Sequence, residues 1–181
     1  YDLVTFYDNH DMARLDASDA GFIDAHNWLF TARGIPAVYY GSEIGFMRGR
    51  AEHAGNRNYF GAERIAAAPS HPIYRQLQRI ARLRASTPAL QRGLQLNLEL
   101  TGTRAAFLRV YEHAGTRQTA LVLLNKGEAP QQFTPALPPG TWRNPRLWVL
   151  SLTGGFLFLN LVYAGLSRAP AAHGGVFLSG L

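Results

Sequence analysis

The sequence predicts an α/β region followed by an all-β region. In the first part, two short apolar runs at 3–7 and 36–40 flank a segment with helical periodicity. A strand, a helix and a strand in that order are typical of a βαβ unit, whose parallel strands are covered on both faces. In the second part, apolar and polar residues alternate from Leu94 onward, as in antiparallel sheets. These observations predict two domains, 1–92 and 93–181.

Two helices are predicted in the first domain. Ser18 is a candidate N-cap for a helix that runs to about Arg33, because a hydroxyl oxygen can accept a hydrogen bond from a free N–H of the first turn. Ser70 is the candidate N-cap of a second helix over 71–86. Between the helices, 44–69 form an irregular segment with four glycines. A loop of that length in a compact domain is usually functional.

The second domain is predicted to be an antiparallel β-sandwich. The alternating residues at 94–100 are followed by apolar runs at 106–111 and 119–124, and short strands at this spacing are typical of such sandwiches. Residues 147–167 form a stretch of 21 uncharged residues that is long enough to span a bilayer. Its Gly154-Gly155 pair and its β-branched residues favour two strands around a turn, so we expect no membrane span.

Composition excludes several classes of protein. A hydrophobic fraction of 47% and a charged fraction of 17% exclude a disordered chain. The absence of cysteine excludes disulfides, thiolate catalysis and cysteine-based zinc sites. Residues 1–60 carry a net charge of −3 and residues 61–181 one of +9, but the arginines of the second part are scattered, so no nucleic-acid surface is predicted. The six histidines lack metal-ligand spacing, so no metal site is predicted.

Two motifs accompany the two predicted strands. Asp-Asn-His-Asp at 8–11 follows the first strand, and Gly-Ile-Pro-Ala-Val-Tyr-Tyr-Gly-Ser-Glu at 34–43 contains the second. In this order, separated by one helix, they closely resemble the α-amylase family of glycoside hydrolases and transglycosylases. With Gly-Asn-Arg at 55–57 added, the pattern is most similar to cyclodextrin glucanotransferases and bacterial α-amylases. The resemblance implies that 1–92 form the last two βα units of a (β/α)8 barrel and that a β-sandwich follows.

The resemblance also implies roles for individual residues. Asp11 occupies the position of the carboxylate that grips the 2- and 3-hydroxyls of the sugar and stabilises the transition state, and His10 that of a histidine that binds the same sugar. In the transferases, an arginine and an acidic residue four positions before it contact a more distal donor sugar. Arg57 matches that arginine, but His53 replaces the acidic residue, so this subsite is matched only in half. Asp8 is expected to anchor the strand end.

The family's nucleophilic Asp and acid Glu lie on strands four and five, which would precede residue 1. The resemblance therefore implies part of a retaining enzyme that hydrolyses or transfers α-1,4-glucosidic bonds in starch-like polysaccharide, with the isolated chain inactive. A trehalose synthase or sucrose-acting relative, and a non-catalytic binding homologue, stay open as alternatives. The expected partner is an α-glucan. No cofactor is expected in this segment. The resemblance allows for a Ca²⁺ ion in a longer parent protein, bound outside this segment.

Polymeric glucan is usually met outside the cell, so a secreted or periplasmic location is expected. The sequence leaves the oligomeric state open. Residues 143–168 match no part of the resembling family, and their origin is left open as well.

Overall fold

The computed structural model describes residues 3–134, 136 and 176–179. The chain divides into two compact units, Tyr1–Thr87 and Pro88–Leu181. The first unit holds a pair of parallel strands with helices on one side of it, and the second holds a four-stranded antiparallel sheet. The motifs quoted above all lie in the first unit.

Helix α1 (Asp19–Thr31) begins where the sequence predicts it to begin. The Ser18 hydroxyl accepts a hydrogen bond from the N–H of Gly21 at 3.2 Å, which confirms Ser18 as the N-cap. The helix ends two residues earlier than predicted. Gly34 then turns the chain toward the next strand with φ at 108°, a conformation that residues with a side chain rarely adopt.

Helix α3 (Pro72–Ala85) corresponds to the second predicted helix, but its predicted N-cap is wrong. Ser70 lies in the preceding 3₁₀ turn η2 (Ala68–Ser70), and its hydroxyl donates back to the carbonyl of Ala67 at 2.7 Å. The cap is His71, whose Nδ1 accepts from the N–H of Ile73 at 3.3 Å. Because Pro72 fixes a helical φ and lacks an N–H, it fits the first helical position, and this makes the residue before it the cap.

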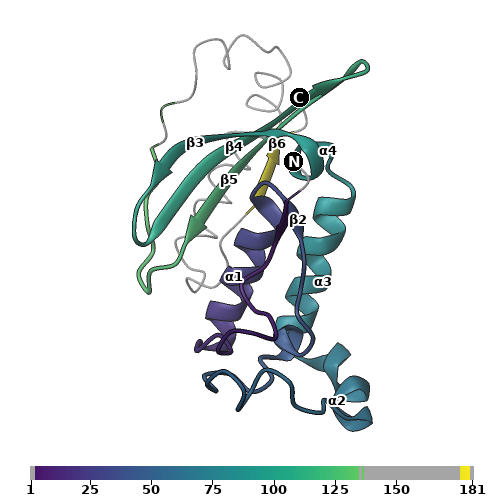
Figure 1. Cartoon of the computed structure of the whole chain (residues 1–181). Helices are drawn as coiled ribbons and strands as arrows, with labels where there is room; N and C mark the ends of the chain where they lie inside the picture. Colours follow the sequence, from purple (N-terminus) through teal and green to yellow (C-terminus); the bar gives the residue numbers. More distant parts are fainter. Residues whose placement is uncertain (1–2, 135, 137–175, 180–181) are drawn as a thin grey trace. The chain divides into compact units, whose positions relative to one another are not determined.

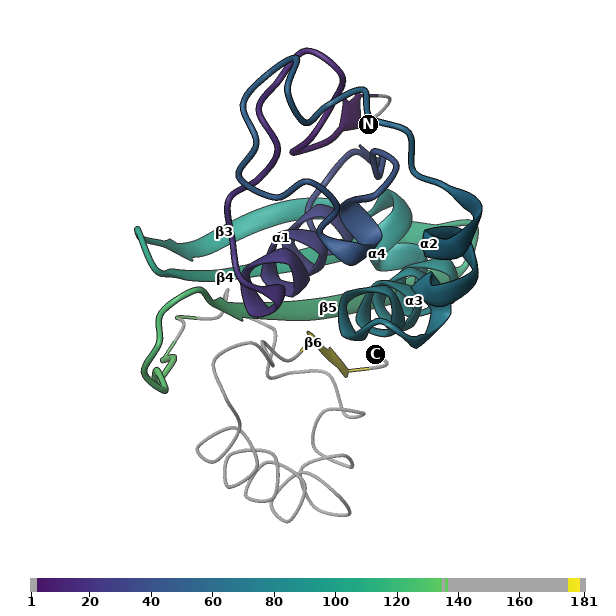
Figure 2. The same cartoon turned by 90° about the horizontal axis from the view of Figure 1, so that it is seen from below.

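The two long helices of the first unit lie side by side in both views (Figures 1 and 2). A buried arginine of α3 joins them, since the Arg84 guanidinium donates to the carbonyls of Phe30 at 2.8 Å, Ala32 at 3.3 Å and Gly34 at 2.5 Å. These carbonyls belong to the end of α1 and the turn after it, where a cation is favourable. Apolar side chains of both helices are buried: Phe22, Leu29, Ile73 and Ile80.

Strands β1 (Val4–Thr5) and β2 (Ile35–Pro36) pair in parallel, as the sequence predicts, but each is only two residues long. The N–H of Ile35 donates to the carbonyl of Leu3, and that of Ala37 to the carbonyl of Thr5, both at 2.8 Å. In such a ladder the residue between two donors points its own N–H the other way. Pro36 has no N–H and stands at that position, so it costs the pair no hydrogen bond.

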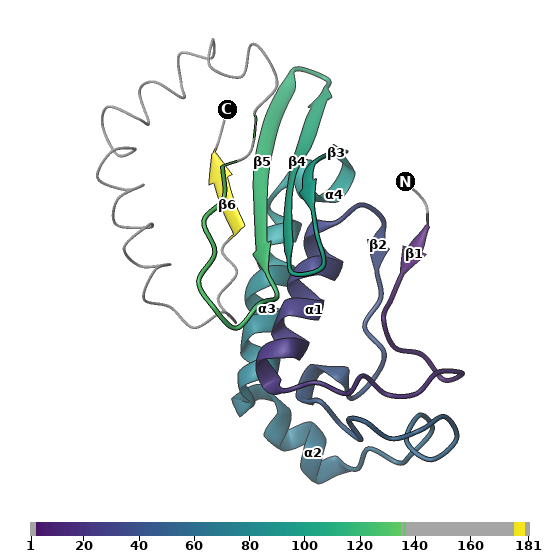
Figure 3. The ribbon, with the colours of Figure 1, turned by 90° about the vertical axis from the view of Figure 1, so that its left-hand side faces the viewer.

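The prediction that this strand pair is covered on both faces is wrong for the described residues. Leu3 is 75% exposed and Ile35 is 50% exposed, and Val4 is exposed as well. Figure 3 shows the reason within the first unit, because α1 and α3 both lie on the same side of the pair. Apolar side chains on its other side therefore face solvent in the described part of the chain.

The long segment after β2 is mostly irregular, as predicted. It contains the short 3₁₀ helix η1 (Ser42–Ile44) and the six-residue helix α2 (Ala62–Ala67). The loop after β1 and the loop after β2 lie at the same end of the strand pair (Figure 3). This arrangement brings two polar segments of the sequence together.

The described residues of the second unit form an antiparallel sheet in the order β3-β4-β5-β6 (Figure 2). The first three strands confirm the predicted runs, and the fourth pairs with β5 at the edge of the sheet: β3 (Leu94–Leu100), β4 (Arg104–His113), β5 (Thr116–Asn125) and β6 (Val176–Ser179). The short helix α4 (Pro88–Arg92) packs against β4 and β5, which places the division of the chain a few residues before the predicted boundary at 92/93.

Several predictions fall on residues outside the described part of the chain. The segments 143–168 and 147–167 lie there entirely. The second sheet of the predicted sandwich is not among the described strands, so the sandwich stays a prediction. No helix in the ranges that the structure describes is long and apolar enough to cross a membrane.

A buried histidine ties α1 to the loop after β1. The Nε2 atom of His26 lies 2.8 Å from the Tyr7 hydroxyl, and the two rings meet edge to face at 5.4 Å. Burial lowers the pKa of His26 to about 4. An unfolded chain leaves the imidazole in water with its ordinary pKa near 6.5.

Stability should therefore fall with acid through His26. Between about pH 6.5 and pH 4 the unfolded chain takes up a proton that the folded chain does not, so the free energy of unfolding rises with pH in this window. We expect His26 to account for a loss of about 3 kcal/mol between pH 7 and pH 4. Denaturant unfolding of wild type and His26→Gln across this range measures the difference.

Exposed His113 provides the matched control, and His113→Gln should keep the slope of the wild type. If His26→Gln fails to fold, an NMR titration of the His26 ring in the wild type gives the pKa directly. An ordinary pKa near 6.5, or equal slopes for wild type and His26→Gln, would contradict the expectation.

Candidate functional site

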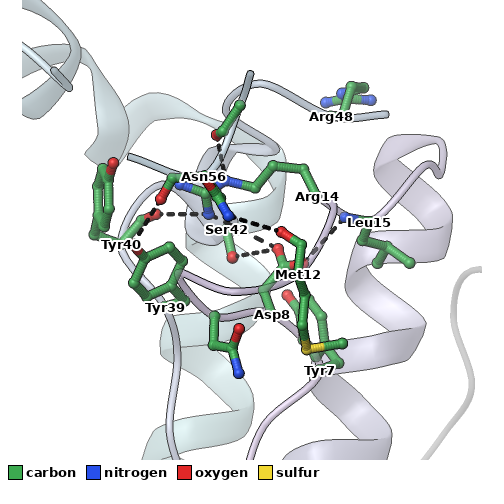
Figure 4. A network of polar contacts seen from close by, with 12 residues as sticks. Tyr7, Asp8, Met12, Arg14, Leu15, Tyr39, Tyr40, Ser42, Arg48 and Asn56 are labelled. Carbon is green, nitrogen blue, oxygen red and sulfur yellow. Dashed lines mark hydrogen bonds and ion pairs between the residues drawn. The ribbon is translucent and has the colours of Figure 1, made fainter. Parts of the chain in front are cut away.

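The candidate site lies at the carboxyl ends of β1 and β2, where the loop at 8–15 meets the loop at 40–58 (Figure 4). Side chains at the ends of neighbouring parallel strands come together at one edge of the sheet, and loops held by such a framework commonly carry function. The contacts separate into a buried network, which fixes the two loops, and an exposed cluster above it.

Asp8 anchors the end of β1, as predicted. Its buried carboxylate accepts from the N–H of Leu15 at 3.1 Å through Oδ1 and from the Ser42 hydroxyl at 2.9 Å through Oδ2. The guanidinium of Arg14 lies 3.8 Å from the same Oδ2 atom. Asp8 therefore joins the loop after β1 to the loop after β2, and its lone pairs are used within the fold.

Arg14 is the centre of the buried network. Its Nε donates to the carbonyl of Gly55 at 2.9 Å and its Nη1 to the carbonyl of Tyr40 at 3.0 Å. The guanidinium carbon lies 4.6 Å from the centre of the Tyr39 ring and 4.9 Å from that of Tyr40, within the range of cation–π attraction. Planar donors and a delocalised charge suit this position, which a lysine could not fill in the same way.

The exposed cluster consists of three of the four predicted site residues. One carboxylate oxygen of Asp11, Oδ2, lies 3.0 Å from Nε2 of His10, and the other, Oδ1, accepts from Nη2 of Arg57 at 2.9 Å. The side chains of Asp11 and Arg57 are 60% and 57% exposed. Asn9 supports the turn, because its Oδ1 accepts from the N–H of Asp11 at 2.8 Å. Both oxygens of Asp11 thus have partners, yet solvent reaches them.

The fourth predicted residue, His53, lies apart from this cluster in its contacts. Its Nε2 lies 3.2 Å from Oε1 of Glu52, and its side chain is largely exposed. The backbone of His53 has φ at 63°, which is uncommon for a residue with a side chain. The structure therefore unites His10, Asp11 and Arg57 and gives His53 a separate acidic neighbour.

Asn56 carries a role that the sequence does not reveal. It is fully buried, and its Nδ2 donates to the carbonyl of His10 at 2.5 Å and to that of Met12 at 3.3 Å. Its Oδ1 accepts from the N–H of His53 at 3.1 Å. In the sequence, Asn56 is only the middle residue of the Gly-Asn-Arg motif and has no predicted role. Only the fold places it against a loop more than forty residues away.

The two tyrosines after β2 hold the same loop from its other side. The Tyr39 hydroxyl donates to the carbonyl of Asn56 and the Tyr40 hydroxyl to that of Asn58, both at 2.7 Å. Burial raises the pKa of Tyr39, so its hydroxyl keeps its proton as a donor. In the described part of the chain, no group of three or more potential metal-ligating side chains occurs.

Comparisons with known proteins identify the family. No family model matches the chain. It is 31% identical over 172 residues to a cyclomaltodextrin glucanotransferase of Geobacillus stearothermophilus, covering 91% of this chain and 22% of that protein. It is 31% identical over 148 residues to an α-amylase of Niallia circulans, covering 78% and 26%.

Solved structures agree with these relatives. A cyclomaltodextrinase superposes with a TM-score of 0.59 at 27% identity, covering 74% of this chain and 22% of that one. An α-amylase from Geobacillus thermoleovorans, complexed with acarbose, superposes with a TM-score of 0.56 at 28% identity, covering 72% and 28%. The chain belongs to the α-amylase family.

Membership of the α-amylase family confirms the resemblance that the strand-end motifs suggest. The similar proteins named above are glycosidases and a glycosyltransferase, so this is a family of enzymes. The chain spans about a quarter, or less, of the length of the relatives it matches.

Loss of Arg14 should destabilise the first unit strongly. In Arg14→Met, the buried carboxylate of Asp8 loses its cation and the carbonyls of Tyr40 and Gly55 lose their donors. Breaking a buried pair on one side costs about 3 kcal/mol or more. Denaturant unfolding of the wild type and the variant at neutral pH measures this loss.

Arg48 provides a matched control in the same unit. It pairs with Asp19 at 2.6 Å, but both side chains are partly exposed, so Arg48→Met should cost about 1 kcal/mol or less. If both variants lost the same free energy of unfolding, burial of the Asp8–Arg14 pair would add nothing to stability.

Proposed function

We propose that this chain supplies one wall of the sugar-binding site in a retaining enzyme that acts on α-1,4-glucosidic bonds of starch-like glucans. The observation that carries the proposal is the exposed cluster of Asp11, His10 and Arg57 at the ends of the two strands. The kinship with amylases and cyclomaltodextrin glucanotransferases supports it. Because both hydrolases and a transferase are among the relatives, water and sugar both remain acceptors in the proposal.

Asp11 is the transition-state stabiliser in this proposal. A retaining glycosidase uses one carboxylate as nucleophile and one carboxylic acid as proton donor, about 5 Å apart, and passes through an oxocarbenium-like transition state. A further carboxylate that accepts from the sugar hydroxyls makes charge-assisted hydrogen bonds. Such bonds raise turnover when they strengthen as the ring flattens, because they then favour the transition state over bound substrate.

His10 and Arg57 hold the Asp11 carboxylate from two sides. Each uses one oxygen, so the second lone pair of each oxygen is left for a hydroxyl donor. The guanidinium of Arg57 places a positive charge against the Asp11 carboxylate. His10 then binds the same sugar as Asp11, and Arg57 contacts a more distal one. In this proposal His53 faces the distal sugar in place of an acidic side chain.

The remaining chemistry belongs to other parts of the enzyme. In this proposal, 1–92 are the last two βα units of a (β/α)8 barrel, 93–181 are a β-sandwich, and the nucleophile and the acid stand on earlier barrel strands. The exposed apolar side of β1 and β2 is the face that such strands would cover. We further propose a secreted or periplasmic enzyme whose Ca²⁺, where present, is bound outside this segment.

Asp11→Asn in the whole enzyme tests the proposal. The amide keeps the shape of the side chain but removes the charge that is needed in the transition state, so kcat on maltoheptaose should fall by roughly a thousandfold. The unfolding midpoint should change little, because the side chain is exposed. Steady-state kinetics and denaturant unfolding give the two quantities.

Asp19→Asn is the matched control, since Asp19 is also a partly exposed aspartate that pairs with an arginine of the first unit. It should leave kcat unchanged. Near-normal turnover in Asp11→Asn would end the proposal. The isolated 181-residue chain should show no turnover, and activity from it would mean that other carboxylates do the chemistry.

His10→Ala should act mainly on substrate binding. Loss of one hydrogen bond to the sugar is expected to raise KM by about tenfold, with a smaller change in kcat. Kinetics on maltoheptaose separate the two parameters. An unchanged KM together with an unchanged kcat would exclude His10 from the sugar contact.

A further inference from the structure

We propose that Asn56 is a positioning residue that sets the spacing between Asp11 and Arg57. It would thereby couple recognition of the distal sugar to stabilisation of the transition state. This inference rests on the proposed function, because it assigns work to the same site. It adds a buried residue that touches neither sugar nor the reacting atoms.

The Asn56 side chain forms hydrogen bonds to the backbone on both sides of Asp11. Its Nδ2 donates to the carbonyls of His10 and Met12, which lie on either side of Asp11 in the chain. A single amide therefore holds the backbone before and after the carboxylate that we place at the transition state. Figure 4 shows this side chain reaching across to the loop after β1.

The backbone of Arg57, the other member of the pair, is held in place as well. Arg57 follows Asn56 directly, and hydrogen bonds to three nearby carbonyls fix the main chain around it. Arg14 donates to the carbonyl of Gly55, Tyr39 to that of Asn56 and Tyr40 to that of Asn58. The backbone that carries Arg57 is thus anchored, and Asn56 joins it to the backbone that carries Asp11.

Asn56 is buried, whereas the ion pair between Asp11 and Arg57 is exposed. Asn56 has no exposed surface, so water cannot replace the hydrogen bonds that a substitution removes. The Arg57–Asp11 contact itself is exposed, and exposed ion pairs hold a geometry only weakly. The distance between the charges of Asp11 and Arg57 therefore depends more on the buried side chain of Asn56 than on the attraction between the two charges.

A double-mutant cycle on the whole enzyme tests this inference. Asn56→Ala and Arg57→Ala should each lower kcat/KM on maltoheptaose by about tenfold, and the double variant should be little worse than either one. Once Arg57 is gone, its spacing from Asp11 no longer matters. A residue that acts only on general stability would instead multiply its loss with that of Arg57→Ala.

Asn58→Ala is the matched control. Its Nδ2 donates to the carbonyl of Ala54 at 3.3 Å, inside its own loop, so kcat/KM should stay within about twofold of the wild type. If Asn56→Ala fails to fold, Asn56→Ser replaces it, and the same non-additivity with Arg57→Ala is expected. Denaturant unfolding of every variant separates loss of fold from loss of positioning.

The outcomes distinguish the inference from the proposed function. An active wild type with multiplicative losses in the cycle would overturn the role of Asn56 and leave the proposed function in place. A whole enzyme without any activity on α-glucans would overturn both.

Discussion

The buried guanidinium of Arg14 is the interaction on which the rest of the site depends. It meets the carboxylate of Asp8 at the end of β1, the carbonyl of Tyr40 after β2 and the carbonyl of Gly55 in the long loop. Three segments that are distant in the sequence therefore contact the same guanidinium. A cation without its partners would be costly in the interior, so the three segments are fixed together or not at all.

The exposed cluster depends on this buried layer for its geometry. Asp11 and Arg57 are held by the backbone beneath them, and Asn56 links the two backbones through hydrogen bonds that water does not reach. Their side chains remain open to solvent, as a site for a polar ligand requires. A rigid base with accessible polar groups above it limits the reorganisation that binding must cost.

Features that depend on neighbouring residues could be predicted from the sequence, whereas features that depend on tertiary packing could not. Ser18 was predictable as an N-cap because a hydroxyl before a helical pattern has a local partner in the first turn. His71 was not predictable as an N-cap. Ser70 is the better capping residue by type, but Pro72 takes the first helical position and so makes His71 the cap. The motif at 8–11 pointed to Asp11 and His10. The Gly-Asn-Arg motif pointed to Arg57 but gave Asn56 no role, because the hydrogen-bond partners of Asn56 lie in a distant loop.

The order of the main elements, the antiparallel strands after residue 93 and the family could all be inferred from the amino-acid sequence alone. Periodicity and strand-end motifs are written along the chain, so they can be read without coordinates. The folded chain was needed to show that Arg57 contacts Asp11, that His53 pairs with Glu52 and that Asn56 joins two loops. These contacts depend on the conformation of two loops. Buried hydrogen bonds between segments that are distant in the sequence fix that conformation, so no local pattern reveals it.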